Sequence, residues 1–246
     1  MPVERTDADG IVTLTLNRPD ARNALSLDLI LAFRAALDQV RVDQSARVVI
    51  VAGAGKSFCA GMDLRGVMDD PATMGRMLRE LAEATVTLRN LPCPTIASVQ
   101  GAAVGGGCGL AVVCDFAISH ADAKLGYPEV DLGVSPAVVA PWLIRKIGAG
   151  RARAMLLRGG TISGTEALAM GLVDRLAPQA EVGSAASALA AALMAGGKNA
   201  LSVTKRWLNE LDGSWDSDAV LRGATLSAEV IQTEEAQTRV RARMNG

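Results

Sequence analysis

The sequence predicts an α/β fold followed by a C-terminal α-helical region. Apolar runs typical of strands alternate with helix-like segments as far as about residue 182, whereas residues 183–246 have helical patterns with no strand between them. A chain of 246 residues that is 50% hydrophobic can also bury a sizeable core. We therefore expect an α/β core, residues 1–182, and a helical region, residues 183–246, whose apolar faces pack on the core of the same subunit or on a neighbouring subunit.

The first half of the chain contains three strand-like runs. Residues 11–16 and 95–99 are rich in β-branched side chains, and residues 47–52 have the composition of a buried strand. Ser26 is placed to cap a helix, because apolar residues follow it at helical spacing. Residues 65–90 are charged and rich in methionine, which predicts a loop that passes into a helix.

The second half continues this alternation and then becomes wholly helical. Ser163 is placed to cap a short helix that Gly171 ends. The other expected elements, in order, are a strand over 116–119, a loop over 124–134, helices over 137–147 and 149–157, a strand over 172–176, and helices over 184–197, 199–211 and from 217 onward.

Composition excludes several classes of function. The net charge is −1 and aromatic residues make up 3% of the chain, so neither a basic surface nor a stacking platform for nucleic acid is expected. No apolar run approaches the roughly 20 residues of a membrane span, and the polar start lacks the apolar stretch of a secretory signal.

Cysteine and histidine usage narrows the chemistry further. The single histidine, His120, lies in a polar stretch, which argues against a Ser-His-Asp or Cys-His site. The four cysteines have neither metal spacing nor the density of a disulfide scaffold, which predicts reduced thiols in a cytoplasmic protein and no metal site. These cysteines are Cys59, Cys93, Cys108 and Cys114.

Two strand-like runs lead into glycine. Residues 101–109 carry five glycines, and residues 58–64, reading FCAGMDL, contain another. Where a strand enters such a cluster and leaves as a helix, unpaired N–H groups favour negative charge, which suggests an anion or oxyanion site built from main chain. A tight packed turn explains the glycines equally well. The cluster lacks GxGxxG spacing, which argues against a dinucleotide site.

Glu129 is the candidate acid or base. It lies in GYPEVDLG, residues 126–133, where Pro128 fixes the backbone and apolar neighbours favour a raised pKa of the carboxyl. For a single glutamate in a loop, a solvated surface charge is the alternative. Paired backbone donors beside such a carboxyl would stabilise a carbonyl oxygen as it becomes an enolate or oxyanion.

Four motifs, in order and spacing, resemble those of the crotonase (enoyl-CoA hydratase/isomerase) superfamily. They are Asn17-Arg18-Pro19 with Asn23-Ala24-Leu25, residues 58–64, Gly105-Gly106-Gly107, and Pro128-Glu129 with Leu132-Gly133. The resemblance spans about residues 3–211, and residues 171–174 also fit. It implies a crotonase-like spiral of ββα units with a C-terminal helical region, assembled as a homotrimer or a dimer of trimers.

The same resemblance implies a substrate and roles for individual residues. The substrate would be an acyl-CoA thioester, with CoA present only as part of it and no cofactor. The N–H groups of Met62 and Gly106 would hold the thioester oxygen, and Glu129 would be the acid/base. The positions implied to line the CoA and acyl pocket are Ala24, Leu25, Ala60, Asp63, Leu64, Gly105 and Pro128.

One departure from the family leaves the reaction open. Hydratases of this family with two carboxylates carry the first at the position of Gly109 and the second at that of Glu129. A single glutamate is enough to move a double bond from C3 to C2, which favours an isomerase. Residues 129–137, however, resemble a subgroup of the family that is labelled hydratases, some of them similar to methylglutaconyl-CoA hydratase. Members of this subgroup can also carry Gly at the position of Gly109. A second carboxylate could come from Asp69, Asp70 or Asp131.

Hydration of a 2-enoyl-CoA to a 3-hydroxyacyl-CoA is the first hypothesis. The alternatives are a Δ3-Δ2 enoyl-CoA isomerase, an acyl-CoA-binding protein with little turnover, and a thioester hydrolase or decarboxylase on the same fold. The length and branching of the acyl chain depend on residues 65–90 and on the C-terminal helices, which the sequence does not resolve. The chain ends in RVRARMNG, residues 239–246, in place of the aromatic and basic, Pro-containing tail common in the family.

Overall fold

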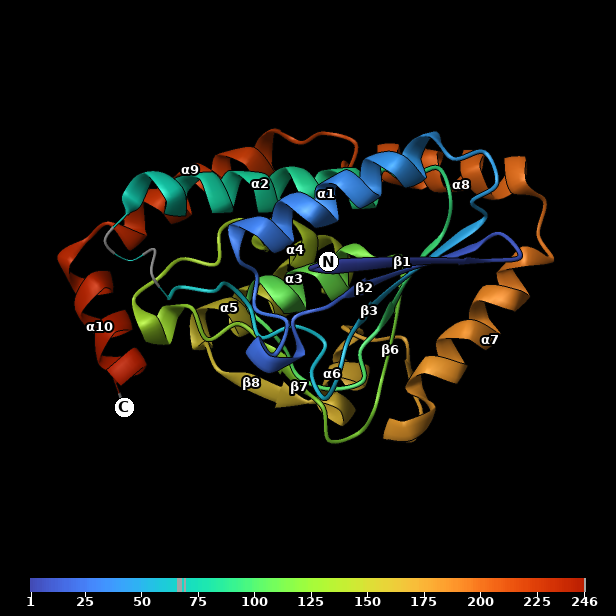
Figure 1. The fold of residues 1–246 in the computed structure, drawn as a ribbon. Helices are drawn as coiled ribbons and strands as arrows, with labels where there is room; N and C mark the ends of the chain where they lie inside the picture. Colours follow the sequence, from blue (N-terminus) through green and yellow to red (C-terminus); the bar gives the residue numbers. More distant parts are fainter. Residues whose placement is uncertain (66–67, 69, 246) are drawn as a thin grey trace.

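The computed structural model describes residues 1–65, 68 and 70–245. Figure 1 shows a twisted central sheet with helices on both of its faces. A six-stranded sheet has the order β1-β2-β3-β4-β6-β9, and a three-stranded sheet has the order β5-β7-β8. In the larger sheet β1 is antiparallel to β2 and all other neighbours are parallel. The strands are β1 (Val3–Ala8), β2 (Ile11–Leu16), β3 (Val48–Gly53), β4 (Thr95–Ser98), β5 (Ala103–Val104), β6 (Phe116–Ser119), β7 (Lys124–Gly126), β8 (Thr161–Ser163) and β9 (Arg175–Leu176).

Helices follow most of these strands and then continue alone to the end of the described chain. The α-helices are α1 (Leu27–Val42), α2 (Pro71–Arg89), α3 (Gly106–Val113), α4 (Ala140–Ile147), α5 (Ala149–Arg158), α6 (Gly164–Met170), α7 (Val182–Met194), α8 (Lys198–Leu211), α9 (Asp218–Ile231) and α10 (Glu234–Asn245). Three short 3-10 helices are η1 (Pro19–Ala21), η2 (Val130–Leu132) and η3 (Gln179–Glu181). The mixed α/β fold with a C-terminal helical region is the predicted fold class.

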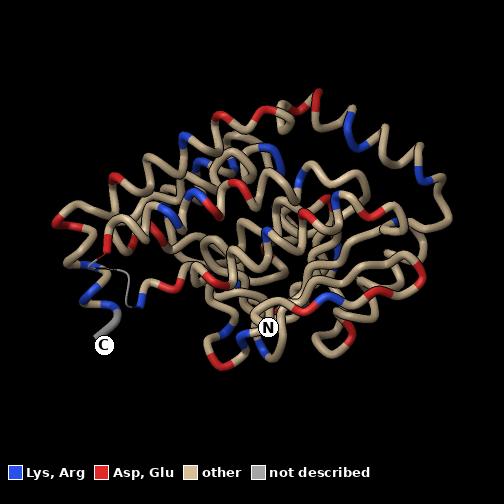
Figure 2. The backbone as a smooth tube through the Cα atoms, turned by 45° about the horizontal axis from the view of Figure 1, so that its top comes forward, with Lys and Arg blue, Asp and Glu red and all other residues tan. Residues whose placement is uncertain are grey.

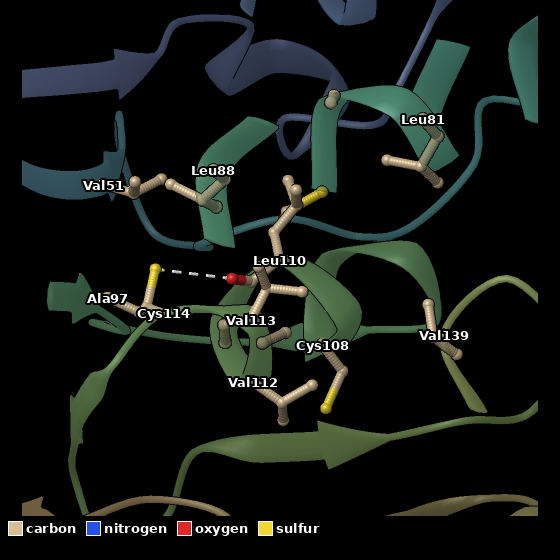
Figure 3. Packing of buried hydrophobic residues seen from close by; sticks show 14 of the residues in the cluster. Val51, Leu81, Leu88, Ala97, Cys108, Leu110, Val112, Val113, Cys114 and Val139 are labelled. Atoms are coloured by element: carbon tan, nitrogen blue, oxygen red, sulfur yellow. Dashed lines mark hydrogen bonds between the residues drawn. The ribbon is translucent and has the colours of Figure 1, made fainter. Parts of the chain in front are cut away.

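Side-chain alternation along the strands builds two cores. In β3, Val49 and Val51 face the large core that α1, α2 and α3 cover, whereas Val48 and Ile50 face α7. Figure 3 shows Leu110 of α3 and Leu88 of α2 in the large core. The sheet is therefore buried on both faces, as expected for parallel strands that read as continuous apolar runs.

Capping residues place the ends of two helices as the sequence predicts. The Ser26 side chain accepts a hydrogen bond from the Leu29 N–H at the start of α1. Ser163 and Glu166 form a reciprocal capping box at the start of α6, and Gly171 ends that helix in the left-handed conformation.

Several elements differ from the sequence-based expectation. Strand β1 was not expected because it is an edge strand on which Val3 alone is buried, so it lacks an apolar signal. The short strands β5, β7 and β8 carry too few residues for a period to show. Helix α3 begins at Gly106, within the glycine cluster, where the low helix propensity of glycine gives no helical pattern in the sequence. The final expected helix is two helices, with the break at Gln232 and Thr233.

The helices after residue 182 pack closely on the rest of the molecule. Helix α7 lies on β3, β4 and β6, and α9 lies along α2 (Figure 1). The division into residues 1–182 and 183–246 stays a prediction. In the described part of the chain no single helix is both long and apolar enough to cross a membrane. The segments 179–194 and 198–211 meet that test only as a pair, and they are bent by 106° at their junction.

Candidate active site

The site begins at the N-terminus of α3. Gly105 precedes the helix with φ +55°, a conformation that side chains with a Cβ rarely adopt, and its carbonyl accepts the first helical hydrogen bond, from Gly109. Gly106 is the first helical residue, so its N–H has no acceptor within the helix. Among the described residues, no backbone carbonyl accepts from this N–H. It is free to donate to a ligand.

A second free N–H comes from the segment that holds Met62. The Leu25 N–H donates to the Gly61 carbonyl at 2.8 Å, and the Asp63 N–H donates to the Leu25 carbonyl at 3.0 Å. Because successive N–H groups of an extended chain point to opposite sides, the Met62 N–H points away from Leu25. No hydrogen bond from it to another described residue is formed.

Two strand ends bring these donors to one place. Cys59 pairs with Ala103 as an isolated parallel bridge, and the Val104 N–H donates to the Cys59 carbonyl at 3.0 Å. Gly61, with φ +90°, lies so close to the chain beside it that a Cβ there would be 2.8 Å from the Val104 carbonyl oxygen. The glycines are thus needed for the close approach of two backbones, as in the tight packed turn considered from the sequence. The same arrangement also leaves two N–H groups unpaired, as an oxyanion site requires.

Two amide side chains fix the loop before Met62. Buried Asn23 donates from Nδ2 to the carbonyls of Ala54 and Ser57, both at 2.9 Å, and Gln100 donates to the Ser57 carbonyl at 3.0 Å. The sequence showed Asn23 within a motif but gave no reason for it. Its role depends on residues more than thirty positions away, which a local pattern cannot reveal.

Both donors line a cavity of about 120 Å³. The wall near the donors consists of Ala60, Gly61, Met62, Val104, Gly105, Gly106, Pro128 and Glu129. The remainder is mostly apolar and consists of Leu64, Met74, Leu78, Leu81, Leu132, Val134, Ser135, Pro136, Val138, Val139, Ser227 and Ile231. The structure therefore brings together six predicted site residues at one end of an apolar cavity: Ala60, Met62, Gly105, Gly106, Pro128 and Glu129.

The Glu129 carboxylate lies directly over the start of α3. A Cβ at Gly105 would be 2.7 Å from Glu129 Oε1, so a side chain at this position would displace the carboxylate. Glu129 Oε2 is buried and has no hydrogen-bond partner among the described residues. Burial raises the pKa of the Glu129 carboxyl to about 7 against the lowering effect of its own backbone N–H, and the charge of Asp131 raises it as well. Such a carboxyl can both accept and donate a proton near neutral pH.

Two of the expected sources of a second carboxylate, Asp70 and Asp131, do not line the cavity. A Cβ at Gly109 would be 2.3 Å from Val139 Cγ1, so Val139 occupies the space that a longer side chain there would need. Asp131 Oδ2 accepts a hydrogen bond from the Gly160 N–H at 3.0 Å, and the Asp70 side chain accepts from the Thr73 N–H at the start of α2. Neither side chain turns into the described cavity. Asp69 lies outside the described residues. In the described lining, Glu129 is the single carboxylate.

A second cavity, of about 230 Å³, adjoins the first and shares Ala60, Met62 and Leu64 with it. Arg22 and Arg65 bring positive charge to its wall, and the ion pair between Arg18 and Asp63, at 3.0 Å, braces it. The full lining is Asp20, Ala21, Arg22, Ala24, Ala60, Met62, Asp63, Leu64 and Arg65. Four predicted pocket residues therefore lie here: Ala24, Ala60, Asp63 and Leu64.

Leu25 does not belong to either described lining. It is buried, and a Cβ at Gly106 would lie 3.0 Å from its Cδ1. Leu25 therefore supports the site from behind: its backbone holds the Met62 segment and its side chain packs against the start of α3. Its side chain packs in the core, and the assignment of Leu25 to the substrate pocket stays a prediction.

Other reactive side chains lie apart from this chemistry. The four cysteines are free and buried, and burial raises the pKa of the Cys59 and Cys108 thiols to about 12, which disfavours the nucleophilic thiolate. His120 does not line the cavity. Among the described residues, no group of three His, Cys, Asp or Glu side chains is placed to hold a metal ion. Charges of both signs are interspersed along the chain in Figure 2.

Comparisons with known proteins agree with this geometry. The sequence profile of the enoyl-CoA hydratase/isomerase family matches residues 6–242. The chain is 34% identical to a crotonyl-CoA hydratase of Syntrophomonas wolfei over 81% of this chain and 78% of that one. It is 33% identical to a short-chain-enoyl-CoA hydratase of Clostridium acetobutylicum, over 81% and 77% of the two chains. A crystal structure of an enoyl-CoA hydratase/isomerase from Mycobacterium paratuberculosis superposes with a TM-score of 0.90 at 25% identity, covering 98% of both chains.

Proposed function

Because the chain belongs to the enoyl-CoA hydratase/isomerase family, we propose that it adds water across the C2=C3 double bond of a 2-enoyl-CoA and releases a 3-hydroxyacyl-CoA. The observation that carries this proposal is the buried Glu129 carboxylate beside two unpaired backbone N–H groups in one cavity. Relatives that match most of the chain are named as hydratases of crotonyl-CoA and of short-chain enoyl-CoA, which supports the same reaction.

The proposed mechanism assigns one role to each group. The N–H groups of Met62 and Gly106 donate to the thioester oxygen and stabilise the enolate that forms when hydroxide adds to C3. The Glu129 carboxylate accepts the proton that water loses and then returns it to C2 of the enolate. Water supplies both the hydrogen that is added to C2 and the hydroxyl group that is added to C3, so the step needs no cofactor. The CoA moiety lies in the adjoining cavity beside Arg22 and Arg65.

Two substrates in heavy water distinguish the reactions open to this site. The protein is incubated in D₂O with crotonyl-CoA and, separately, with 3-hexenoyl-CoA, and the masses of the products are measured by mass spectrometry. A product of crotonyl-CoA that has gained the mass of D₂O supports hydration. Thioester cleavage, loss of CO₂ or binding without turnover would replace the proposal with one of the other functions of this fold.

Isomerisation from Δ3 to Δ2 is the second candidate, and one observation favours it. Val139 fills the space beside Gly109, so the described cavity holds one carboxylate, which is sufficient to take a proton from C2 and return it to C4. Conversion of 3-hexenoyl-CoA to the 2-enoyl isomer without a gain of water, and no hydration of crotonyl-CoA, would favour this reaction over hydration.

Replacing Gly109 with glutamate, and Val139 with glycine to make room for it, tests whether the reaction needs a second carboxylate. Gly109→Glu alone is expected to destabilise the protein, because its Cβ would be 2.3 Å from Val139 Cγ1. The double variant Gly109→Glu with Val139→Gly removes that clash, and we expect its hydration kcat to exceed that of Val139→Gly alone by about tenfold or more, the usual contribution of an acid-base group. Equal kcat values for the folded double and single variants would contradict a two-acid requirement.

The rate is expected to depend on pH through Glu129. Since burial holds the pKa of this carboxyl at about 7, the proton-accepting carboxylate forms as pH rises through about 7, and kcat/KM rises with it. Asp131→Asn removes a charge that raises this pKa, so the midpoint of the profile is expected to move to lower pH. Rate profiles of both proteins measured with crotonyl-CoA check this; an unchanged midpoint in Asp131→Asn would contradict it.

We also propose that the chain assembles as a homotrimer or a dimer of trimers in the cytoplasm. Five large apolar side chains on α8 and the loop after it are each more than half exposed in the single chain, a surface that a neighbouring subunit would cover: Val203, Trp207, Leu208, Leu211 and Trp215. Sedimentation equilibrium is expected to give the mass of three or six chains, and a monomer at micromolar concentration would refute the assembly.

A further inference from the structure

The apolar part of the cavity that holds Glu129 is lined by residues of α2 and of α9. Resting on the proposed function, we propose that Met74 and Ile231 form an end wall that limits the acyl chain to about six carbons, and that the cavity rejects acyl chains bearing a second carboxylate. The position of each wall residue relative to the donors follows from the geometry of the two helices.

The positions of the lining residues along helix α2 give the length of the cavity. Leu81 lies at the donor end, because a Cβ at Gly106 would be 3.1 Å from its Cδ2. Leu78 and Met74 follow at one and two helical turns toward the start of α2, and all three line the cavity. Seven residues at 1.5 Å per residue place Met74 about 10 Å from Leu81 along the helix axis. Of the α2 residues in the lining, Met74 is therefore the farthest from the donor end.

Helix α9 contributes two residues to the lining. Ser227 and Ile231 line the cavity. Ala228, next to Ser227, packs against α2: a Cβ added at Gly75 would lie 4.0 Å from the Ala228 Cβ. The Ser227 hydroxyl donates to the Ser135 carbonyl at 2.8 Å, which ties α9 to the loop after Glu129. Met74, Ser227 and Ile231 are all buried.

The volume sets the number of carbons. A dry apolar cavity of about 150 Å³ in another protein accepts benzene, which has six carbons. The cavity here measures about 120 Å³ and includes the space beside Gly106 and Glu129 that the reacting carbons themselves must fill. It therefore holds a butenoyl group with ease and a hexenoyl group at its limit, whereas a decenoyl group requires the wall to move.

The charge of the lining excludes a second group of substrates. No Lys, Arg or His is present among the described lining residues, and Glu129 already contributes one carboxylate. The carbonyl of Ser135 is an acceptor that the Ser227 hydroxyl already satisfies, so it offers nothing to an anion. A carboxylate at the end of the acyl chain would be buried without a partner, which is strongly unfavourable. Glutaconyl-type thioesters are therefore poor ligands for this chain.

Binding of saturated thioesters tests the wall without any need for turnover. Isothermal titration of the purified protein compares butyryl-, decanoyl- and glutaryl-CoA with free CoA. We expect butyryl-CoA to bind about tenfold or more tightly than either of the other two thioesters. A pocket that is too short for an acyl chain lowers its affinity by at least this factor. Burial of an unpaired carboxylate lowers the affinity further. Decanoyl- or glutaryl-CoA binding as tightly as butyryl-CoA would overturn the corresponding half of the proposal.

Met74→Ala is expected to raise the affinity for decanoyl-CoA and leave that for butyryl-CoA within a few-fold. Leu88→Ala is the matched control, because Leu88 is an equally buried residue of α2 that does not line the cavity, and it should leave the preference unchanged. Ile231→Val is the milder second variant if Met74→Ala does not fold. A preference that neither wall variant alters overturns the assignment of the wall. Thioesters that bind no better than free CoA contradict the proposed function itself, which separates the two outcomes.

Discussion

Replacing Glu129 with glutamine is expected to lower kcat by about 10³-fold while acyl-CoA binding changes by no more than a few-fold, since general acid-base catalysis contributes about 10²- to 10⁴-fold. Glutamine keeps the size of the side chain but neither accepts nor releases a proton at the required positions. Among the described residues that line the cavity there is no other carboxylate to take over the transfer. Stopped or continuous assays of the heavy-water reaction, with calorimetric binding of butyryl-CoA, separate the two effects.

The matched control is Asp131→Asn, which neutralises a carboxylate on the same loop that bonds to the Gly160 N–H rather than facing the cavity. It is expected to keep most of the activity at a pH well above the midpoint. A Glu129→Gln variant with near-normal turnover would remove Glu129 from the mechanism and require a different group in the cavity.

The second large effect is expected for Gly106→Pro. Proline is well tolerated at the first position of a helix, where Gly106 lies, so α3 should still form. The substitution removes the N–H that we assign to the thioester oxygen. Loss of one oxyanion donor costs about 10²- to 10³-fold in kcat in enzymes of known mechanism. Steady-state kinetics with crotonyl-CoA, together with circular dichroism to verify folding, measure this loss.

Gly106→Ala isolates the N–H from the effect of added bulk. Both substitutions introduce a Cβ, which would lie 3.0 Å from Leu25 Cδ1 and 3.1 Å from Leu81 Cδ2, at the flexible ends of both side chains. Alanine retains the donor, so its kcat should stay far above that of the proline variant. Equal kcat values in two folded variants would show that the Gly106 N–H does not act on the substrate.

Local chemistry explains which parts of the fold the sequence could predict. Ser26, Ser163 and Gly171 act on backbone groups within four residues, so their patterns specify the ends of α1 and α6 directly. β1 is held by pairing with β2 at the edge of the sheet, and its exposed polar side chains carry no such signal. The start of α3 was hidden because glycine is a poor helix former, and here close contacts select it.

The site shows the same division between local and distant causes. The motifs around Met62, Gly106 and Glu129 could be found by their order in the sequence, and the structure places all three in one cavity. Val139 could not be found, because its relation to Gly109 is a contact between α3 and the start of α4, thirty positions apart. Leu25 was assigned to the pocket on position alone, but its side chain points into the core.

The wall that the two cavities share links recognition of the carrier to the chemical step. Ala60, Met62 and Leu64 face both the cavity with Arg22 and Arg65 and the cavity with Glu129. A CoA moiety held in the former would therefore fix the backbone that presents the Met62 N–H to the latter. Binding energy far from the reacting bond then lowers the activation barrier rather than KM alone. Pantetheine thioesters, which lack the nucleotide part, should accordingly turn over more slowly even at saturation.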